Sequence, residues 1–567
     1  MATDYPWFKS YDKGVPHTLE PYPKVTFMDV VEDSARKRPS HPFLFFKGRT
    51  ITYGEMVKFA AIFSAALKAN GVKKGDRVAI LLPNCPQGFI SSFGTWKAGG
   101  IAVPLNPMYT EHELEHALKE CGAEVAVVLT PFYATVKKVQ GRTSLRLVIA
   151  VNIKEYLPSF LALMFTLLKE KKEGHRIKLA QNDVYMADLM TRHAGDTPPD
   201  YRPIPDDIAL LLFSGGTTGV PKGVILTHKC LVAEAWQLKV WNDSVLTEWD
   251  DVVMMIMPLF HVYGFAGVMG TSIMGHNPLA VVPNPRDRDD LVKTINKVKP
   301  AYFPAVPTLF IALLEHPAVK EGKVDFRSMK LCVASAAPLL PETKRRFEEL
   351  TGGKLIEGYG MTELTAAITL GPVEGKWTPG SAGVPLPDVI VRIVDVETGE
   401  KDLPGGQEGE IIAKCPQIMP GYWNSPEATS EMIRNGWLHT GDIGYLNDEG
   451  CLFITSRKKE LIKPGGFQVW PREVEEVIST HPKVAEVGVA GIPDAYQVEA
   501  VKAWIVLKEG ETATAEEIQL HCREKLTAYK VPKFVEFRTE LPKTLVGKIL
   551  KRILVEGEIA KQKTAKK

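Results

Sequence analysis

Residues 212–223, LFSGGTTGVPKG, form a glycine- and threonine-rich stretch that ends in a lysine. Glycines let backbone amides approach phosphate oxygens, threonine hydroxyls donate hydrogen bonds, and Lys222 adds a positive charge. A P-loop has four residues between its first glycine and a Gly-Lys-Ser/Thr sequence, whereas Lys222 stands between Pro221 and Gly223. The stretch therefore predicts a phosphate site of another type and disfavours a P-loop ATPase or phosphotransferase. The plainer alternative is a solvent-exposed loop between a strand and a helix.

Other single residues are ambiguous when each is taken alone. Glu363 in YGMTE could bind Mg²⁺ beside a phosphate loop, or could simply be an acid in the first turn of a helix. Asp442 in HTGD indicates a turn, and Arg457 and Lys548 are typical of a solvated surface. His261 lies in a stretch without Asp, Glu, Lys or Arg, where a histidine is most often a core residue.

Composition narrows the class of protein. The 567 residues predict three or four structural units, and a net charge of +2 offers no large field for nucleic acid. Seven cysteines lack the spacing of a zinc site or a disulfide framework, which favours a reducing cytoplasm. No signal peptide is visible in the first residues.

Buried apolar runs alternate with helical patterns through the first two thirds of the chain, which predicts parallel sheets with helical crossovers. Thr110 and Glu113 form a candidate capping box, and Pro341 and Gly352 are placed to open and close a helix. Short strands with turns follow Gly380, and the last hundred or so residues mix strands and helices. We expect an α/β protein whose N-terminal domain (1–456) has two doubly wound sheets and a small β-barrel, followed by a smaller α+β domain (457–567).

Two apolar stretches raise the question of membrane contact. Residues 252–285 are broken by Pro and Gly, so a buried strand followed by a packed helix is favoured over a membrane span. Residues 157–174, LPSFLALMFTLLKEKKEG, are too short to span a bilayer but end in lysines. They fit either a helix lying on a membrane surface or an ordinary surface helix.

Seven motifs stand in one order along the chain: SGGTTGVPKG, KAGGIAVPLNP, PLFHVYG, YGMTE, GWLHTGD, SRKKELIKPGG and PKTLVGK. In this order they resemble the acyl-adenylate-forming enzymes, a superfamily that includes acyl-CoA synthetases, luciferase-like enzymes and peptide-synthetase adenylation domains. The resemblance runs from ITYGEM at 51 to GKILKR at 547 and is closest to the fatty-acid-CoA ligases.

The resemblance implies a role for each matching residue. Nucleotide binding falls to Ser214, Gly215, Gly216, Thr217, Thr218, Gly219, Lys222, Glu357, Gly358, Tyr359, Gly360, Thr362, Asp442, Arg457 and Lys548. Glu363 and Thr217 would hold Mg²⁺. The catalytic residues would be Lys548, His261, Thr362 and Glu363. The acid and CoA would meet His261, Ala336, Gly465, Gly466 and Phe467, and Lys459 would be the hinge about which the C-terminal domain turns.

The implied reaction uses ATP, Mg²⁺ and coenzyme A. A carboxylate attacks ATP to give an acyl-adenylate and pyrophosphate, with Lys548 stabilising the developing charge, and a thiol then displaces AMP. No acidic group follows PLFHVYG to receive an amino-acid ammonium, and the apolar pocket segments favour a medium- or long-chain fatty acid. An aryl acid such as coumarate is the nearest alternative.

A membrane-associated fatty-acid-binding or uptake protein is the alternative from another class. We expect a cytoplasmic enzyme, peripheral to the inner membrane face if residues 157–174 touch lipid. Its homodimerisation is left open by the sequence.

Overall fold

The computed structural model describes residues 5–214, 221–464, 469–494, 498–543 and 549–565. Its first sheet has seven strands and contains the segment that leads into the glycine-rich stretch. Strands β5 and β6 are buried along their whole length, as expected where helices cover both faces of a parallel sheet. All neighbours pair in parallel except the edge strand β9. The strand order is β7 (Val184–Tyr185), β6 (Leu147–Val151), β5 (Val125–Leu129), β3 (Arg77–Leu81), β4 (Ile101–Pro104), β8 (Ile208–Ser214) and β9 (Lys222–Thr227).

The second sheet has nine strands, and its six central strands run in parallel. Antiparallel strands close it at both edges. Because the carboxyl ends of parallel strands share one edge, the segments that follow β10, β12, β13 and β14 must lie near one another. The order is β16 (Val384–Pro385), β15 (Thr369–Leu370), β14 (Lys354–Tyr359), β13 (Leu331–Ser335), β12 (Tyr302–Ala305), β10 (Val253–Met255), β11 (Leu279–Val281), β1 (Pro42–Phe46) and β2 (Arg49–Thr52).

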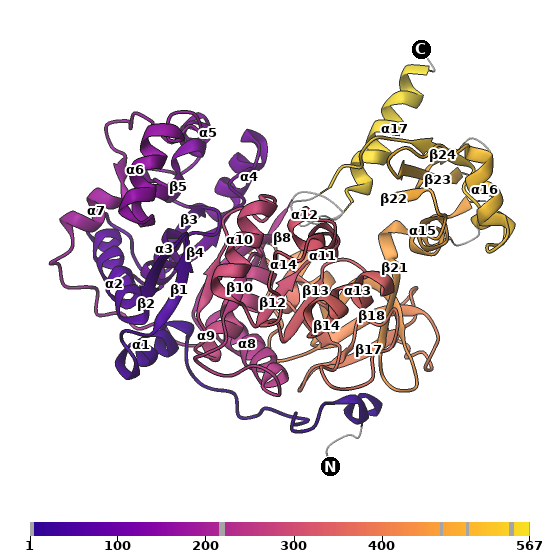
Figure 1. Cartoon of the computed structure of the whole chain (residues 1–567), viewed down its shortest axis with the longest axis horizontal. Coiled ribbons are helices and arrows are strands. Elements are labelled where there is room, and N and C mark those ends of the chain that lie inside the picture. Colours follow the sequence, from indigo (N-terminus) through magenta and orange to yellow (C-terminus); the bar gives the residue numbers. More distant parts are fainter. Residues whose placement is uncertain (1–4, 215–220, 465–468, 495–497, 544–548, 566–567) are drawn as a thin grey trace.

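Helices bury their apolar faces against these sheets (Figure 1). Every residue of α3 (Pro86–Lys97) except Lys97 is buried, and α3 packs against α2 (Tyr53–Ala69). The predicted capping box at Thr110 is present at the start of α4 (Glu111–Cys121). Helix α13 (Pro341–Thr351) begins at the predicted proline and ends at Gly352, whose φ of 72° lies in the left-handed region. The predicted start of α4 and the predicted start and end of α13 are therefore confirmed.

The remaining helices of this domain connect the strands, and among them α8 and α9 are largely buried. They are α1 (Phe27–Lys37), α5 (Tyr133–Gln140), α6 (Ser159–Leu168), α7 (Met186–Arg192), α8 (His228–Asn242), α9 (Thr271–Met274), α10 (Arg288–Val298), α11 (Pro307–Leu314) and α12 (Pro317–Lys320).

The small β unit predicted after Gly380 is an antiparallel sheet of five strands. Its order is β17 (Ile390–Val394), β18 (Gly409–Lys414), β20 (Trp437–Leu446) and β19 (Ile433–Arg434), with β21 (Leu452–Arg457) also pairing with β20. The helix α14 (Pro426–Met432) precedes β19. The α/β class, with two α/β sheets and a small β unit, is confirmed.

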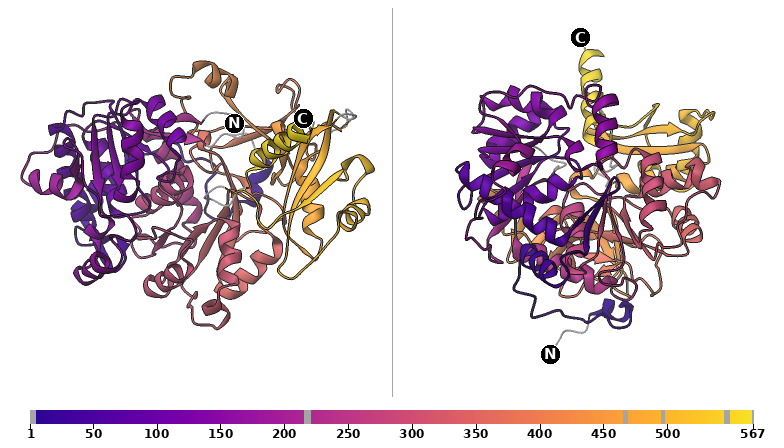
Figure 2. Two further views of the ribbon diagram at one scale, coloured as in Figure 1. Left: turned by 90° about the horizontal axis from the view of Figure 1, so that it is seen from above. Right: turned by 60° about the vertical axis from the view of Figure 1, so that its left-hand side comes forward.

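The C-terminal domain is smaller and lies to one side of the rest (Figures 1 and 2). Its sheet joins β22 (Val484–Asp494), β23 (Val498–Leu507) and β24 (Phe534–Phe537), and it has its own apolar core, which includes Val474, Val489 and Ile518. Its helices are α15 (Pro471–Ser479), α16 (Ala515–Arg523) and α17 (Lys551–Ala565). The predicted boundary at residue 456 stays a prediction, although it falls within β21, just before the 3₁₀ turn Lys458–Glu460.

The stretch 252–285 forms β10, a buried helical segment at 263–274, and β11, as the sequence predicts. Within the described residues, every helix is too short or too polar to cross a bilayer.

Candidate functional site

The centre of the site is a buried carboxylate held by two partners. Asp442 on β20 is 3% exposed. Its Oδ2 accepts a hydrogen bond of 2.7 Å from the Tyr359 hydroxyl, and its Oδ1 lies 2.8 Å from Nε of Arg457. The antiparallel register of β20 and β21 places Asp442 opposite Arg457, and Tyr359 ends β14 of the nine-stranded sheet. Two sheets thus meet at one carboxylate and fix its orientation.

The protonation states of this cluster follow from its burial and charges. Burial raises the pKa of Tyr359 well above its usual value, and the neighbouring charge of Asp442 raises it further. Burial opposes the charge on Arg457, but the surrounding negative groups, Asp442 first among them, together outweigh burial and raise the pKa of Arg457. Thr440 accepts a bond of 3.0 Å from the amide of Asp442 and donates one of 2.7 Å to the carbonyl of Ile411. The Asp442 carboxylate therefore lies beside a protonated phenol and a charged guanidinium.

Two glycines at the end of β14 permit close packing. A Cβ on Gly360 would lie 1.5 Å from the carbonyl oxygen of Ala366, and a Cβ on Gly358 would lie 2.5 Å from a methyl group of Leu370. Gly360 is therefore required by the approach of the backbone at Ala366, whatever it contacts in a complex, whereas the methyl group of Leu370 could shift to accept a side chain at Gly358.

Glu357, on the same strand, is buried. Its carboxylate accepts a bond of 3.2 Å from the amide of Leu339, and burial raises its pKa to about 6. The structure thus directs Glu357 toward the segment that leads into α13, whereas Tyr359 points to Asp442.

Glu363 lies one turn after β14, in the 3₁₀ segment Thr362–Leu364, and is 6% exposed. Its carboxylate accepts a bond of 2.8 Å from the hydroxyl of Tyr422, and its carbonyl accepts one of 2.9 Å from the amide of Met419. Thr362 precedes it on the same turn and is half-buried. The two residues share one turn, so they can act on the same group.

Lys222 approaches this carboxylate from the seven-stranded sheet. It begins β9 opposite Ser214 of β8, and its Nζ lies 5.5 Å from the centre of the Tyr422 ring. Tyr422 therefore contacts both Lys222 and Glu363. Tyr422 could not be predicted as a site residue, because nothing in the local sequence around GYW distinguishes it from an ordinary core tyrosine.

Several predicted residues lie outside the described residues. These are Gly215, Gly216, Thr217, Thr218 and Gly219 of the glycine-rich stretch, Gly465, Gly466 and Phe467, and Lys548. Lys459 lies within the described 3₁₀ turn, but its side chain is outside the description.

His261 and Ala336 follow two strands of the nine-stranded sheet. Nδ1 of His261 accepts a bond of 3.2 Å from the amide of Tyr263, and burial lowers the pKa of His261 to about 4. The hydroxyl of Tyr263 donates to the carbonyl of Val333 on β13, and Ala336 follows β13 with a φ of 71°. A π-helix at 263–270 comes directly after His261, a departure from α geometry that is frequent at functional sites. The histidine is thus neutral at physiological pH, and the neighbouring Tyr263 connects its segment to β13.

Metal binding at this site would depend on few protein ligands. Among the residues that the structure describes, no three His, Cys, Asp or Glu side chains gather as a metal cluster. Glu363 fits Mg²⁺ because it supplies a buried carboxylate, and Mg²⁺ commonly takes one or two carboxylates with phosphate and water oxygens.

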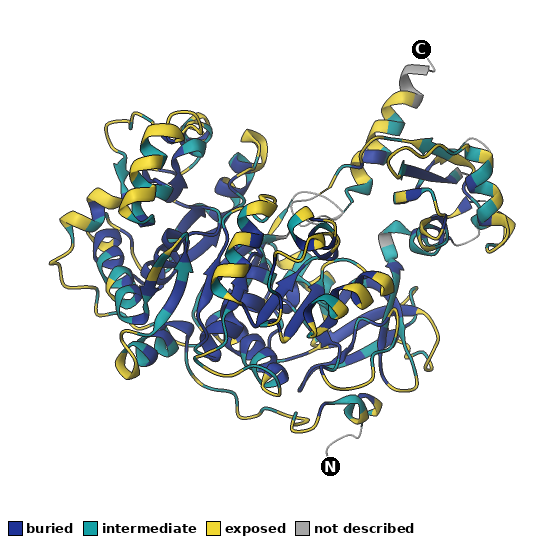
Figure 3. Ribbon diagram, viewed as in Figure 1, coloured by how far each residue is buried: buried dark blue, intermediate teal, exposed yellow. Residues whose placement is uncertain are grey.

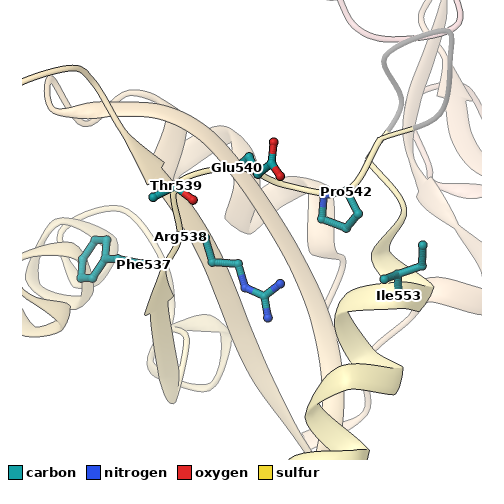
Figure 4. A pocket seen from close by; sticks show the side chains of 6 residues that line it. All are labelled: Phe537, Arg538, Thr539, Glu540, Pro542 and Ile553. Atoms are coloured by element: carbon teal, nitrogen blue, oxygen red, sulfur yellow. The ribbon is translucent and has the colours of Figure 1, made fainter.

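A separate hollow of about 580 Å³ lies in the C-terminal domain (Figure 4). It is lined by Phe537, Arg538, Thr539, Glu540, Pro542 and Ile553, none of which is a predicted site residue. The Arg538 guanidinium there is already paired with Glu536 at 2.9 Å. The hollow is open and lacks the converging polar groups of the Asp442 site.

Known proteins match the chain over nearly its whole length. The family described as AMP-binding enzyme matches residues 31–423, and the AMP-binding enzyme C-terminal domain matches residues 473–548. A long-chain-fatty-acid–CoA ligase of Bacillus subtilis is 41% identical over 98% of this chain and 99% of its own length.

Two further comparisons bear on the acid. The 4-coumarate–CoA ligase 1 of Solanum tuberosum is 32% identical over 89% of this chain and 88% of its own. Among solved structures, an anthranilate CoA ligase in complex with anthranoyl-AMP is 27% identical with a TM-score of 0.82, covering 96% of this chain and 98% of that one.

Proposed function

Since this chain belongs to the AMP-binding enzyme family, we infer that it is an AMP-forming acyl-CoA synthetase and that its acid is a fatty acid. The observation that carries the inference is full-length similarity to a long-chain-fatty-acid–CoA ligase, in a chain whose Asp442, Tyr359 and Arg457 form one buried cluster. ATP, the fatty acid and CoA are its substrates. In the first half-reaction the acid's carboxylate bonds to the α-phosphorus and pyrophosphate leaves. In the second, the CoA sulfur bonds to the acyl carbon and AMP leaves.

The Asp442 cluster would bind the nucleoside. A carboxylate already oriented by Tyr359 and Arg457 can accept hydrogen bonds from two neighbouring ribose hydroxyls without reorganising. Gly358 and Gly360 keep the end of β14 narrow beside it, so the adenine has a backbone surface to lie against. Arg457 adds a positive charge on the phosphate side.

Lys222 and Thr362 would meet the phosphates, together with Ser214 and the residues of 215–219. Glu363, with Thr217, would hold Mg²⁺, which would neutralise phosphate charge when bound. Lys548 would stabilise the charge that develops when two anions meet, an effect strongest where water is excluded. His261, neutral because burial lowers its pKa to about 4, would border the acid without repelling or protonating it.

The second half-reaction requires Lys548 to leave. We propose rotation of domain 457–567 about Lys459, which would bring Gly465, Gly466 and Phe467 to the site as the surface for the CoA thiol, with Ala336 bordering the acyl group. Such rotation is a gating step. The separate core of the C-terminal domain supports its movement as one body.

A medium- or long-chain acid is favoured over an aryl acid. The identity to the long-chain ligase is 41%, against 32% to the coumarate ligase. Helix α6 adds a second reason, because all of its residues are at least partly exposed and it presents Phe160 and Leu167 at 71% and 70% exposure (Figure 3). Such a surface suits an enzyme whose substrate is stored in a bilayer.

We propose that residues 157–174 contact a membrane peripherally, at its inner face. Lys169, Lys171 and Lys172 are exposed at the end of the helix and complement anionic headgroups. Beneath the helix, Glu170 receives a bond of 2.9 Å from Asn152 and pairs with Lys154 at 2.5 Å, which fixes the helix to the end of β6. The seven cysteines are all free and buried, in keeping with the cytoplasm. Homodimerisation is a further hypothesis, tested by sedimentation.

The first experiment measures pyrophosphate and AMP release from ATP and Mg²⁺ across saturated and aryl acids, with and without CoA. We expect AMP release that rises with chain length, requires CoA for turnover and is lost in Lys548→Ala. AMP with aryl acids alone would move the assignment to an aryl-acid ligase. Binding of fatty acid or vesicles without AMP formation from any acid would favour the lipid-uptake class.

A further inference from the structure

Tyr422 lies where the seven-stranded sheet meets the end of the nine-stranded sheet. Its segment pairs with β9, since the amide of Ile225 donates to Gly421 at 3.0 Å and the amide of Trp423 donates to Gly223 at 2.7 Å. The amide of Tyr422 itself donates to Oγ1 of Thr429 on α14 at 2.9 Å. The backbone of Tyr422 is therefore held by hydrogen bonds to both β9 and α14, which fix the position of its Cα and so limit where its side chain can lie.

The side chain uses its two ends differently. The hydroxyl donates to Oε1 of Glu363 at 2.8 Å, while the ring face lies 5.5 Å from Nζ of Lys222. A ring attracts an ammonium through its quadrupole and supplies no full negative charge. The exposed Lys222 ammonium thus lies over the face of the same ring whose hydroxyl bonds to Glu363.

We propose that Tyr422 is a positioning residue that holds the metal-binding carboxylate Glu363 and the phosphate-binding ammonium Lys222 at a fixed separation. A direct Lys222–Glu363 pair would satisfy each group with the other and would have to break before a metal–nucleotide complex could bind. The tyrosine contacts both groups, the carboxylate through its hydroxyl and the ammonium through its ring, and so sets their relative positions. This inference rests on the proposed roles of Glu363 and Lys222.

The protonation state supports the arrangement. Burial raises the pKa of Tyr422 far above its usual value, and the charge of Glu363 raises it further. The hydroxyl is the donor in the bond of 2.8 Å to Oε1 of Glu363, and this bond fixes the direction of the carboxylate.

The test separates the hydroxyl from the ring. Tyr422→Phe removes only the hydroxyl, and Tyr422→Leu removes both contacts. Mn²⁺ binding is followed by electron paramagnetic resonance with an ATP analogue whose α,β-bridge is a methylene group, and binding of metal-free tripolyphosphate is measured by calorimetry. The control is Tyr185→Phe. Tyr185 lies on β7, outside the site, and the substitution removes the hydrogen bond of 3.2 Å that its hydroxyl donates to the carbonyl of Ile177.

We expect Tyr422→Phe to raise the Kd for Mn²⁺ about tenfold, as for a lost bond to a charged group, and to leave tripolyphosphate affinity unchanged. Tyr422→Leu should also lower tripolyphosphate affinity, by roughly threefold. If hydroxyl and carboxylate act together, Glu363→Gln with Tyr422→Phe should lose little more Mn²⁺ affinity than Glu363→Gln alone.

Three results would overturn the proposal: Mn²⁺ affinity of Tyr422→Phe within twofold of wild type, an equal loss in Tyr185→Phe, or additive losses in the double variant. Wild-type protein that fails to bind Mn²⁺ with the analogue would also refute it, together with the role of Glu363. The acid assignment fails separately. If Tyr422→Phe shows the expected loss of Mn²⁺ affinity but the wild-type protein forms AMP from no acid, the role of Tyr422 stands and the ligase assignment fails.

Discussion

The Asp442 cluster and helix α6 break the ordinary rule of burial in opposite directions. At Asp442 the fold encloses a carboxylate, a phenol and a guanidinium, with the carboxylate only 3% exposed. At α6 it leaves large apolar side chains in solvent, with Phe160, Leu163, Leu167 and Leu168 each more than half exposed (Figure 3). Both arrangements are unfavourable for an isolated protein.

The difference lies in what completes each region. The polar cluster is largely satisfied within the chain, so it is rigid before any ligand arrives. The apolar helix is attached through Thr166, which accepts a bond of 3.2 Å from Lys154, through the ring contact of Phe165 with His175, and through Glu170 just beyond its end. Its outer apolar side chains are exposed to solvent. Binding of a small ligand is favoured by polar side chains that are already oriented, whereas binding to a bilayer is favoured by a large exposed apolar surface. The two regions can therefore be tested independently.

The largest effect is expected at Asp442. Asp442→Asn keeps the size of the side chain but removes the charge and one acceptor that faces Arg457. Two hydrogen bonds to a charged group contribute about 1.5–3 kcal/mol each, so kcat/KM for ATP should fall about a thousandfold. Asp395→Asn, in an exposed turn, is the control and should leave kcat/KM unchanged. A fall of less than tenfold at Asp442 would remove it from the nucleotide site.

A loss of about a hundredfold is expected in membrane partitioning when Phe160, Leu167 and Leu168 are changed to Ser. Each buried apolar side chain contributes about 1.5–3 kcal/mol, and partial insertion recovers part of that. Vesicles of phosphatidylcholine and phosphatidylglycerol in equal parts provide the surface, and co-sedimentation gives the partition coefficient.

The matched control changes three scattered apolar residues to Ser. These are Ile204, Leu340 and Leu520, whose exposed fractions are 55%, 53% and 58%. Equal losses in both triple variants would show that general hydrophobicity, and not α6, binds the vesicles. AMP release with a short soluble acid should be the same in wild type and the α6 variant, since α6 is separate from the Asp442 site.

The third prediction concerns the free energy of unfolding and its dependence on the buried carboxylate of Glu357, which lies beside the site. Burial raises its pKa to about 6, above an ordinary value of 4.5, so the folded state binds more protons than the unfolded state between these values. Its contribution to stability is therefore lost as pH rises from about 4.5 to about 6. A shift of this size corresponds to about 2 kcal/mol.

Glu357→Gln removes that titration. Relative to wild type, its free energy of unfolding should rise by about 2 kcal/mol between pH 4.5 and 7, as followed by urea denaturation of the N-terminal domain. Glu342→Gln, on the exposed first turn of α13, is the control. A pH-independent difference would mean that Glu357 titrates normally in the folded protein.

Much of the fold was predictable because its signals are local. The capping box at Thr110, the proline and glycine that bound α13, and the buried runs of β5 and β6 each follow from residues close in sequence. The Asp442 cluster was predictable only as three separate motifs. Their meeting depends on the pairing of β20 with β21 and on the approach of β14, which no local pattern encodes.

Tyr422 and Glu357 show the limit most clearly. Tyr422 acquires its role from strand pairing across two sheets, and Glu357, expected among the nucleotide contacts, bonds to the amide of Leu339. Sequence motifs indicate which residues act at a site, but the direction of each side chain depends on long-range packing.

The smallest effect is expected at Thr440, which supports Asp442 from behind. Its hydroxyl accepts from the amide of Asp442 and donates to the carbonyl of Ile411. Thr440→Val keeps the shape and leaves two backbone groups without a partner, at a cost of about 1 kcal/mol for orientation of Asp442, so the KM for ATP should rise about fivefold. Thr440→Ser keeps the hydroxyl and should restore the wild-type KM. If valine and serine variants behave alike, the shape of Thr440 matters and its hydrogen bonds do not, and the rigidity of the Asp442 cluster then comes from Tyr359 and Arg457 alone.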